Sequence, residues 1–332
     1  MATPPAVLLR AYAPSLAVQS RWLDSRPLAS QLDAWPLERD SLHLQVLSKA
    51  PPGALGASPA VLLERIRQKR QSLADDPAGW NETTAALRRI RLSSSSFRLG
   101  FSLSEYAANR IVTESFAAHA PASLRTHARL WPFASQSFGV NLSVLTADHQ
   151  VLLAVRGTKV DSHHGLFHCA MNEGMNIQDI DSSSQPDVFA AIVRGLQEEL
   201  GIDHDCPSAR IQSLFVTSSH QWAISGFIDL SLTSWTADRL RAAHNQAPDR
   251  HEANLWFVAH EQSALCSALR EPSWIPHGAL TVALAAIDSL GWQSAPALLD
   301  AIAPHVSLKN LATVGVPGVV LGRNPASRSK QS

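Results

Sequence analysis

The spacing of apolar and polar positions changes at about residue 134. Beyond that point, short runs rich in β-branched and aromatic residues predict strands, in 138–157 (two strands around the polar turn TADHQ), 165–175, 209–232 and 252–260. Two longer apolar segments predict helices, a central one that ends at Gly201 and a closing one over 277–292. Mixed strands with these helices predict an α+β sandwich.

The chain before residue 134 has a different pattern. Ser58 can cap a helix that Pro59 begins, and a second helix is predicted over 81–92. Alternating apolar positions over 97–103 predict a half-buried strand, and Ser104 is predicted to cap the helix that follows it. We therefore expect residues 1–133 to form an α-rich or α+β extension or a small α-rich domain of unknown role, 134–300 the sandwich, and 301–332 a C-terminal segment whose last ten residues are disordered.

The central helix places two adjacent carboxylates near its end. Pro186 and Asp187 suit its first turn, and the predicted core stripe recurs at intervals of four, three and four residues, at Phe189, Val193, Leu196 and Leu200. On a helical wheel of this segment, Glu198 lies nearly opposite the apolar stripe and Glu199 lies on its flank. Arg194 is four residues before Glu198, within reach of an ion pair.

Adjacent carboxylates at a helix C-terminus repel each other and face the negative end of the helix dipole. A hard cation would relieve both effects, and Mg²⁺ is commonly held by one or two carboxylates together with substrate phosphate and water. Paired glutamates on an exposed helix are also common as solvated charge. Both interpretations remain open from the helix alone.

The order strand, Glu-Gly, loop, RGLQEELGI helix and further strands resembles the Nudix hydrolase family. Its box reads Gly, five residues, Glu, seven residues, Arg-Glu, an aliphatic residue, any residue, Glu-Glu, any residue, Gly and an aliphatic residue. The matching positions are Arg194, Leu196, Glu198, Glu199, Gly201 and Ile202. The resemblance covers about 134–292 as a fold and is specific over about 25 residues.

Three positions depart from the box. Gly195 stands where the family has a metal-binding glutamate after the arginine. Gly174, the candidate opening glycine, lies 20 residues before Arg194 rather than 14, which makes the loop six residues longer. The early glutamate has no match, because Pro186 stands at its spacing and Asp187 is the nearest acid. A glutamate at 195 would point at the same cation as Glu199, and is expected to strengthen the site.

The resemblance implies an α/β/α sandwich around a mixed sheet and hydrolysis of a diphosphate linkage in a nucleoside-diphosphate-like substrate with Mg²⁺ (or Mn²⁺). It implies Glu198 and Glu199 as metal ligands, Arg194 as the residue that orients a carboxylate, and the Gly174 backbone as an approach to the metal. Glu173 is a candidate for the missing ligand. Glu252, before the strand NLWFVAH, is a candidate catalytic base or distal ligand.

Two other groups of residues are candidates for a zinc site and for a pocket lining. The stretch DSHHGLFH brings together Asp161, His163, His164 and His168, a conceivable zinc site, although a polar hairpin loop is the commoner outcome. His220 and Trp222 share one face of a predicted strand, where they would line a pocket or, more often for tryptophan, belong to the core.

Composition and charge narrow the expected partners and the expected cellular location. The formal net charge is zero, which gives no electrostatic reason to expect nucleic acid or an anionic membrane as partner. Three separated cysteines without a CxxC pair and the absence of a signal-like or membrane-spanning run favour a cytoplasmic protein. The expected ligand is a small diphosphate or nucleotide-like molecule, and a homodimer stays open. The alternative function is a regulatory Nudix-fold module that binds a nucleotide-like ligand without catalysis.

Overall fold

The structure is a computed structural model. It describes residues 16–19, 28–32, 47–48, 56–76, 79–92, 97–119, 136–158, 163–180, 186–202, 209–217, 221–306, 308–310 and 319–321. The predicted boundary at 133/134 and the C-terminal ten residues lie outside these ranges. Within them, no helix combines the length and the apolar character that crossing a bilayer requires.

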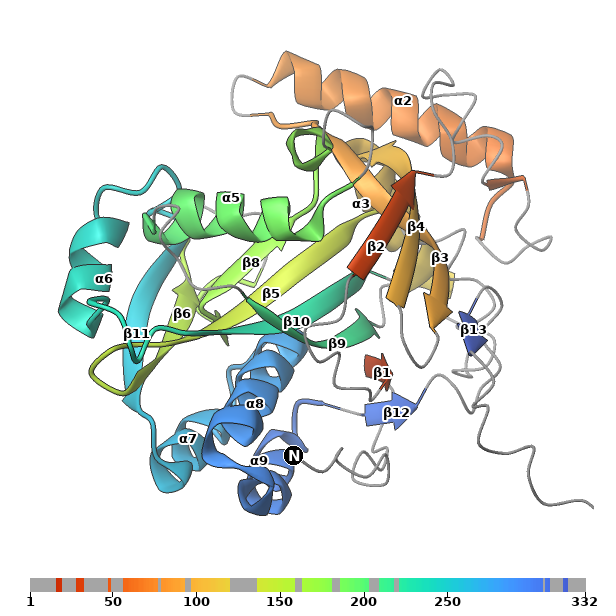
Figure 1. The fold of residues 1–332 in the computed structure, drawn as a ribbon. Helices are drawn as coiled ribbons and strands as arrows, with labels where there is room; N and C mark the ends of the chain where they lie inside the picture. Colours follow the sequence, from red (N-terminus) through yellow and green to blue (C-terminus); the bar gives the residue numbers. More distant parts are fainter. Residues whose placement is uncertain are drawn as a thin grey trace, which may run out of the picture.

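A mixed sheet forms the centre of the molecule (Figure 1). Its strand order is β11-β6-β5-β10-β9-β1-β12, with β7 paired to β6 and β8 to β5. The pairs β5/β10 and β1/β12 are parallel and the others are antiparallel. The strands are β1 (Leu16–Gln19), β5 (Phe138–Leu145), β6 (Gln150–Arg156), β7 (Phe167–Cys169), β8 (Met171–Gly174), β9 (Arg210–Thr217), β10 (Trp222–Asp229), β11 (Ala253–Ala259) and β12 (Leu308–Asn310). The predicted α+β class with a mixed sheet is confirmed.

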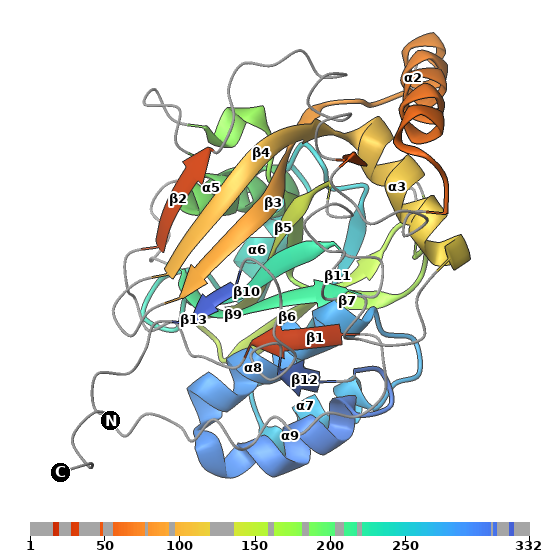
Figure 2. The same ribbon diagram turned by 90° about the vertical axis from the view of Figure 1, so that its right-hand side faces the viewer.

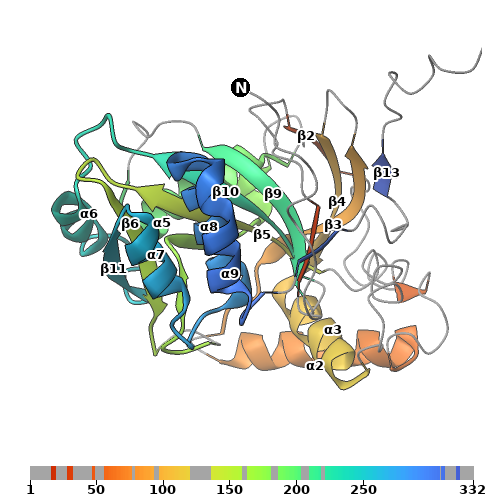
Figure 3. The same cartoon turned by 90° about the horizontal axis from the view of Figure 1, so that it is seen from below.

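Helices cover both faces of this sheet (Figures 1 and 3). On one side lie α5 (Val188–Leu200) and α6 (Ala237–His244); on the other lie α7 (Gln262–Leu269), α8 (Pro276–Leu290) and α9 (Ala295–Ile302). The period of two along a strand divides the side chains between the faces: in β5, Val140, Leu142 and Val144 enter the core under α5, whereas Leu145 enters the core under α8. The predicted closing helix is therefore α8.

A second sheet, of order β13-β3-β4-β2, lies beside the first (Figure 2). Its strands are β2 (Leu28–Leu32), β3 (Thr83–Leu92), β4 (Phe97–Glu105) and β13 (Val319–Leu321). The predicted helix over 81–92 is wrong, because this segment is β3 and pairs antiparallel with β4 along its whole length. Alanine, leucine and arginine favour helix intrinsically, but burial and strand pairing override so weak a preference.

Strands β3 and β4 belong to the same core as α5. Ala85, Leu87, Leu99 and Phe101 are all buried in the cluster that contains Leu196 and Leu200 of α5. The backbone N–H of Ala85 also donates to the carbonyl of Met175, just beyond β8. The described part of the segment before residue 134 thus contains strands as well as helices, and β3 and β4 pack in the same core as the candidate carboxylate helix.

Helices α2 (Pro59–Asp75) and α3 (Tyr106–His119) precede β5 in the chain. The Ser58 hydroxyl accepts from the N–H of Val61 and Pro59 is the first helical residue, so the predicted start of α2 is confirmed. The predicted cap of α3 is wrong. Ser104 is still part of β4 and donates to Gln136, while the Asn81 side chain accepts from the N–H of Ala107.

Helix α5 ends where the sequence predicts but faces the core differently. Asp187 caps its start, and Gly201 adopts the left-handed conformation at its end, with φ of 67°. Phe189 and Val193 are each 39% exposed, so half of the predicted core stripe is wrong. The buried positions are Val188, Ala191, Ile192, Gly195, Leu196 and Leu200. The core-facing side of the helix therefore contains Val188 and Ile192 with the small residues Ala191 and Gly195, in place of Phe189 and Val193.

Because Leu196 faces the core and Val193 does not, substitutions at these two positions of α5 should change the free energy of unfolding by different amounts. Leu196→Ala should lower the free energy of unfolding by about 2–5 kcal/mol, because Leu196 is 2% exposed and its loss leaves a cavity. Val193→Ala should cost no more than about 1 kcal/mol. Urea unfolding of both variants measures the two values, and equal losses would contradict the observed helix face.

Candidate active site

Arg194, Glu198 and Glu199 of α5 lie against β8, which supplies Glu173 and Gly174. Strand β8 is positioned by its pairing with β5, in which Gly139 is opposite Gly174 and Val140 is opposite Glu173. The predicted grouping of these five residues is thus present. The longer loop between Gly174 and α5 does not separate them.

The Arg194 guanidinium is the centre of this group. Its Nε and Nη2 each donate to a different oxygen of Asp179 at 2.9 Å, which is a bidentate pair. Its Nη1 lies 2.8 Å from Glu198 Oε2 and 3.0 Å from Glu173 Oε1, and Nη2 also donates to the Gly174 carbonyl at 2.8 Å. Burial opposes the charged form, but the bonds to Asp179 and the charges of Glu173 and Asp179 raise the pKa of Arg194 above its ordinary value.

Asp179 is a site residue that the sequence analysis did not identify. It is 2% exposed and ends a short 3₁₀ helix, Ile177–Asp179, where its carboxylate also accepts from the N–H of Asn176 in a capping box. The family spacing pointed to Pro186 and Asp187, but Asp187 caps α5 through the N–H of Phe189. Four residues separate Gly174 from Asp179, one fewer than in the box, and fourteen separate Asp179 from Arg194, seven more than in the box, so the insertion follows Asp179. The signal that could have found it is its position five residues after Gly174, one short of the spacing of the early glutamate.

Gly195 faces β8 at a distance that leaves no room for a side chain. A Cβ built there would lie 2.7 Å from Met171 Sδ, 2.9 Å from Glu173 Cβ and 3.1 Å from Glu173 Cγ. Met171 is flexible, but Glu173 Cβ is fixed by its strand. The expectation that a glutamate at 195 would simply join the other ligands is therefore wrong, because the stem of Glu173 already occupies that space.

Glu173 and Glu199 are carboxyls whose charged forms are disfavoured. Burial, with the charges of Glu198 and Asp179, outweighs the attraction of Arg194 and raises the pKa of Glu173 to about 7. Burial, then the charges of Glu173 and Glu252, raise the pKa of Glu199 well above its ordinary value, although Glu199 accepts from the N–H of Asn172 at 3.1 Å. Both carboxyls would gain from a nearby cation.

Glu252 reaches the same region from the start of β11. Its charge acts on Glu199, its Oε2 lies 4.0 Å from Arg156 Nη1, and its carbonyl accepts from Gly157 N–H. The turn before it is attached to α5, because Asp249 N–H donates to the Glu198 carbonyl at 2.9 Å. Glu252 is thus close enough for its charge to raise the pKa of Glu199, and Arg156 adds a positive charge that the sequence did not single out.

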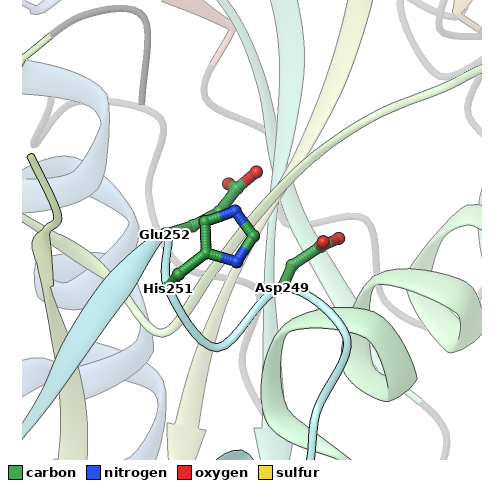
Figure 4. A group of neighbouring side chains, drawn as sticks. All are labelled: Asp249, His251 and Glu252. Carbon is green, nitrogen blue, oxygen red and sulfur yellow. The ribbon is translucent and has the colours of Figure 1, made fainter. Parts of the chain in front are cut away.

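The same turn carries two further potential ligands. One side-chain ligand atom from each of Asp249, His251 and Glu252 lies within 4.8 Å of the others. In Figure 4 the three side chains project from the turn that leads into β11, with the His251 ring between the two carboxylates in this view. His251 is exposed, and exposed polar side chains often gather in this way without a cation. Of these three residues, we therefore assign only Glu252 to the candidate site.

The other predicted groups do not form sites in the described residues. His163 and His164 are exposed and His168 is buried, while Asp161 lies outside the described ranges. No three-ligand group among the described side chains includes these histidines. Trp222 is fully buried in the core, so it lines no pocket, and His220 lies outside the described residues.

Cys169 and His168 are a buried pair with unreactive protonation states. Cys169 Sγ lies 3.1 Å from His168 Nδ1, a contact that could indicate a nucleophile and its base. Burial, however, raises the pKa of the Cys169 thiol far above its ordinary value and lowers the pKa of His168 well below its own. A neutral thiol beside a neutral imidazole does not support thiolate chemistry.

Comparison with known proteins adds no assignment. No family model matches the chain, and no curated protein matches it significantly. Among solved structures, the chain is similar to DR0079 from Deinococcus radiodurans, with a TM-score of 0.31 and 13% identity over 45% of this chain and 82% of that one. A similarity this small carries no argument about fold or chemistry, so the site must be interpreted from its own residues.

The raised pKa of Glu173 predicts how stability depends on pH in the metal-free protein. Between the ordinary pKa of 4.5 and about 7, the folded protein holds a proton on Glu173 that the unfolded chain has released. Stability therefore falls as pH rises through this window. Glu173→Gln removes that loss, so the variant should gain on the order of 1–3 kcal/mol relative to the parent between about pH 5 and about pH 8.

Urea unfolding with a chelator at both pH values measures this difference. Any loss of the bond to Arg194 shifts both values alike and cancels in the comparison. Glu271→Gln, on an exposed position away from the site, is the control and should track the parent. A Glu173→Gln variant that also tracks the parent would show that this carboxyl does not titrate near neutral pH.

Proposed function

We propose that the chain is a Nudix-type hydrolase that cleaves a diphosphate linkage in a nucleoside-diphosphate-like substrate with Mg²⁺ or Mn²⁺. The observation that carries the proposal is the position of Glu173. Its stem fills the space over Gly195, and its carboxylate shares the Arg194 guanidinium with Glu198. The carboxylate absent from the helix at 195 is thus replaced by one from the neighbouring strand.

The donors present fit a hard divalent cation. Glu173, Glu198 and Glu199 offer only oxygen, the ligand that Mg²⁺ and Mn²⁺ prefer. Burial, together with neighbouring negative charges, raises the pKa values of Glu173 and Glu199, so a bound cation would stabilise the charged form of both. When bound, the cation would polarise the phosphorus and lower the pKa of an attacking water.

The protein's own residues supply positioning and charge. Asp179 fixes the Arg194 guanidinium, which in turn orients Glu173 and Glu198. The Gly174 carbonyl accepts from Arg194, so we assign Gly174 to holding the arginine rather than to binding metal. Glu252 lies where it would accept a proton from water, and the Arg156 side chain beside it would attract a phosphate group.

The regulatory alternative is favoured by one observation. Glu173 is already paired with Arg194 at 3.0 Å, and its pKa of about 7 leaves it partly protonated at neutral pH. A carboxyl in that state binds a cation less strongly than a free carboxylate. Cation and nucleotide binding without any turnover would therefore support a binding module.

The proposed activity predicts Mg²⁺-dependent product release from at least one member of a panel of nucleoside diphosphate derivatives. Glu198→Gln and Glu199→Gln should each weaken Mn²⁺ binding and lower kcat/KM at least about tenfold. Asp179→Asn should lower activity by about 10–100-fold through the loss of support for Arg194. Calorimetry with Mn²⁺ and a phosphate-release assay measure these effects, with Glu271→Gln as control. Unchanged Mn²⁺ affinity in both glutamine variants would exclude the cation site.

Moving the carboxylate back to the helix tests the role of Glu173 directly. Gly195→Glu alone should weaken both folding and Mn²⁺ binding, because its Cβ would overlap Glu173. Glu173→Gly alone should weaken Mn²⁺ binding, because it removes a ligand. The double variant Glu173→Gly with Gly195→Glu should bind Mn²⁺ more tightly than either single variant. A double variant no better than Glu173→Gly would contradict the exchange of one carboxylate for the other.

A further inference from the structure

The first turn of helix α8 is held against strand β7. Phe167 N–H donates to the Ser273 carbonyl at 2.7 Å, and the Phe167 carbonyl accepts from Ile275 N–H at 2.9 Å, so the residues just before α8 run parallel to β7. A Cβ at Gly278 would lie only 2.9 Å from the Cα of His168. Glycine at 278 therefore allows the backbone of α8 to approach β7 this closely.

Two backbone donors in this first turn have no acceptor. No side chain caps α8, and Pro276 carries no N–H. Ala279 N–H donates to the Ile275 carbonyl, but among the described residues the N–H groups of His277 and Gly278 have no hydrogen-bond partner. Free N–H groups at the positive end of a helix dipole are suited to an anion. They do not define a site by themselves, because every helix begins with such groups.

The buried imidazole of His168 brings an unsatisfied nitrogen to the same place. Its ring lies 4.9 Å from the ring of His277 in an edge-to-face arrangement, and the Phe215 ring stacks on His277 with centroids 5.9 Å apart. His168 is 1% exposed, and its Nδ1 contacts Cys169 Sγ, whereas its Nε2 has no partner in the described part of the chain. A buried polar atom without a partner is costly, so this nitrogen indicates a ligand that would complete its bonding.

Arg156 adds a mostly buried guanidinium that makes no hydrogen bond to the described residues. Its side chain is 16% exposed, and its ion pair with Glu252 spans 4.0 Å, which is too long for a hydrogen bond. Burial lowers the pKa values of His168 and His277, and the charge of Arg156 contributes to both shifts. The same charge opposes the rise in the pKa of Glu199 that burial causes. Arg156 is therefore within electrostatic range of the two imidazoles and of the acid group.

We propose that the Arg156 guanidinium, the His168 and His277 imidazoles and the first N–H groups of α8 form a phosphate subsite. Each of these groups offers a donor, because a neutral imidazole carries one N–H, which a bound phosphate would favour on Nε2 of His168. A metal ion fits less well, since no three-ligand group among the described side chains includes these histidines and Arg156 would repel a cation.

The subsite deepens the proposed function. Because Arg156 acts on both Glu199 and the imidazoles, a substrate could place one phosphate on the cation and the next phosphate in the subsite. This assignment to the substrate rests on the proposed hydrolase activity. Binding of a phosphate group at the start of α8 does not, because it depends only on the donors there.

Calorimetric titration with inorganic phosphate, in the presence of a chelator, tests the subsite without the cation. The parent should bind phosphate, and Arg156→Gln and His168→Leu should each raise the dissociation constant at least about tenfold, because each removes a donor to a charged group. Arg270→Gln is the matched control, since it removes the same charge from a side chain that is 58% exposed, and it should bind like the parent. Arg156 is partly exposed, so its replacement tests the subsite even if His168→Leu disturbs the core.

Two outcomes of this titration would overturn the subsite. One is a parent that does not bind phosphate, and the other is an equal loss of affinity in Arg156→Gln and Arg270→Gln, which would reduce the effect to net charge. Circular dichroism verifies that each variant is folded.

Activity and Mn²⁺ binding separate this inference from the hydrolase proposal. Mn²⁺ affinity without phosphate should be the same in His168→Leu and in the parent, because His168 is not assigned to the cation site. If no diphosphate compound is hydrolysed but phosphate binding falls in Arg156→Gln as expected, the hydrolase proposal fails and the subsite stands. If hydrolysis occurs and both variants keep the parent's kcat/KM, the assignment of the subsite to the substrate is overturned.

Discussion

The candidate site depends on one buried guanidinium that is shared among several carboxylates. Arg194 makes a bidentate pair with the buried Asp179, and the remainder of its donors reach Glu173, Glu198 and the Gly174 carbonyl. Each partner comes from a different point of the chain, so the arginine joins α5, β8 and the 3₁₀ helix. A buried charge is tolerated only when such partners are complete. Three carboxylates, of Asp179, Glu173 and Glu198, surround one guanidinium, which leaves two negative charges in excess if all are ionised.

That excess supports the proposed cation site over a purely structural role. A structural ion-pair network tends to balance its charges, whereas here burial and neighbouring negative charges raise the pKa of Glu173 to about 7 and raise the pKa of Glu199 well above its ordinary value. The protein thus stores an electrostatic cost that protons relieve at low pH and that a divalent cation would relieve at neutral pH. Exchange of a helical carboxylate at 195 for a strand carboxylate at 173 keeps this excess and changes only the element that carries it.

The sequence predicted the elements that have strong local signals. Gly201 ends α5 in the left-handed conformation, Ser58 and Pro59 begin α2, and the strands over 138–157 and 252–260 follow their patterns. It failed where tertiary contacts decide. Phe189 and Val193 fit an apolar stripe, but a helix that lies close to a sheet needs small residues at the contact, and Ala191 and Gly195 provide them. The intrinsic preferences of residues 81–92 favour a helix, but pairing with β4 makes 83–92 a strand.

In the candidate site, too, residues with a local sequence signal could be predicted and residues placed by tertiary contacts could not. Glu198, Glu199 and Arg194 could be found from their spacing on one helix, because helical geometry fixes their separation. Asp179 could not, since its position depends on where six extra residues enter the loop. The importance of Glu173 could be suspected but not decided, because it requires knowing that its Cβ lies where a Gly195 side chain would begin. A motif written along one helix cannot record a ligand that reaches the same point from another element.

Glu252 shows how far the site extends beyond its helix. It is held by the Gly157 N–H at the last rung of the β11 ladder, and the preceding turn is tied to the Glu198 carbonyl through Asp249. Displacement of β11 would therefore move Glu252 relative to Glu199, whose pKa already responds to it. An edge strand is paired with another strand on one side only, so it is held less firmly than an interior strand. The position of Glu252 relative to Glu199 therefore depends on this one short stretch of backbone.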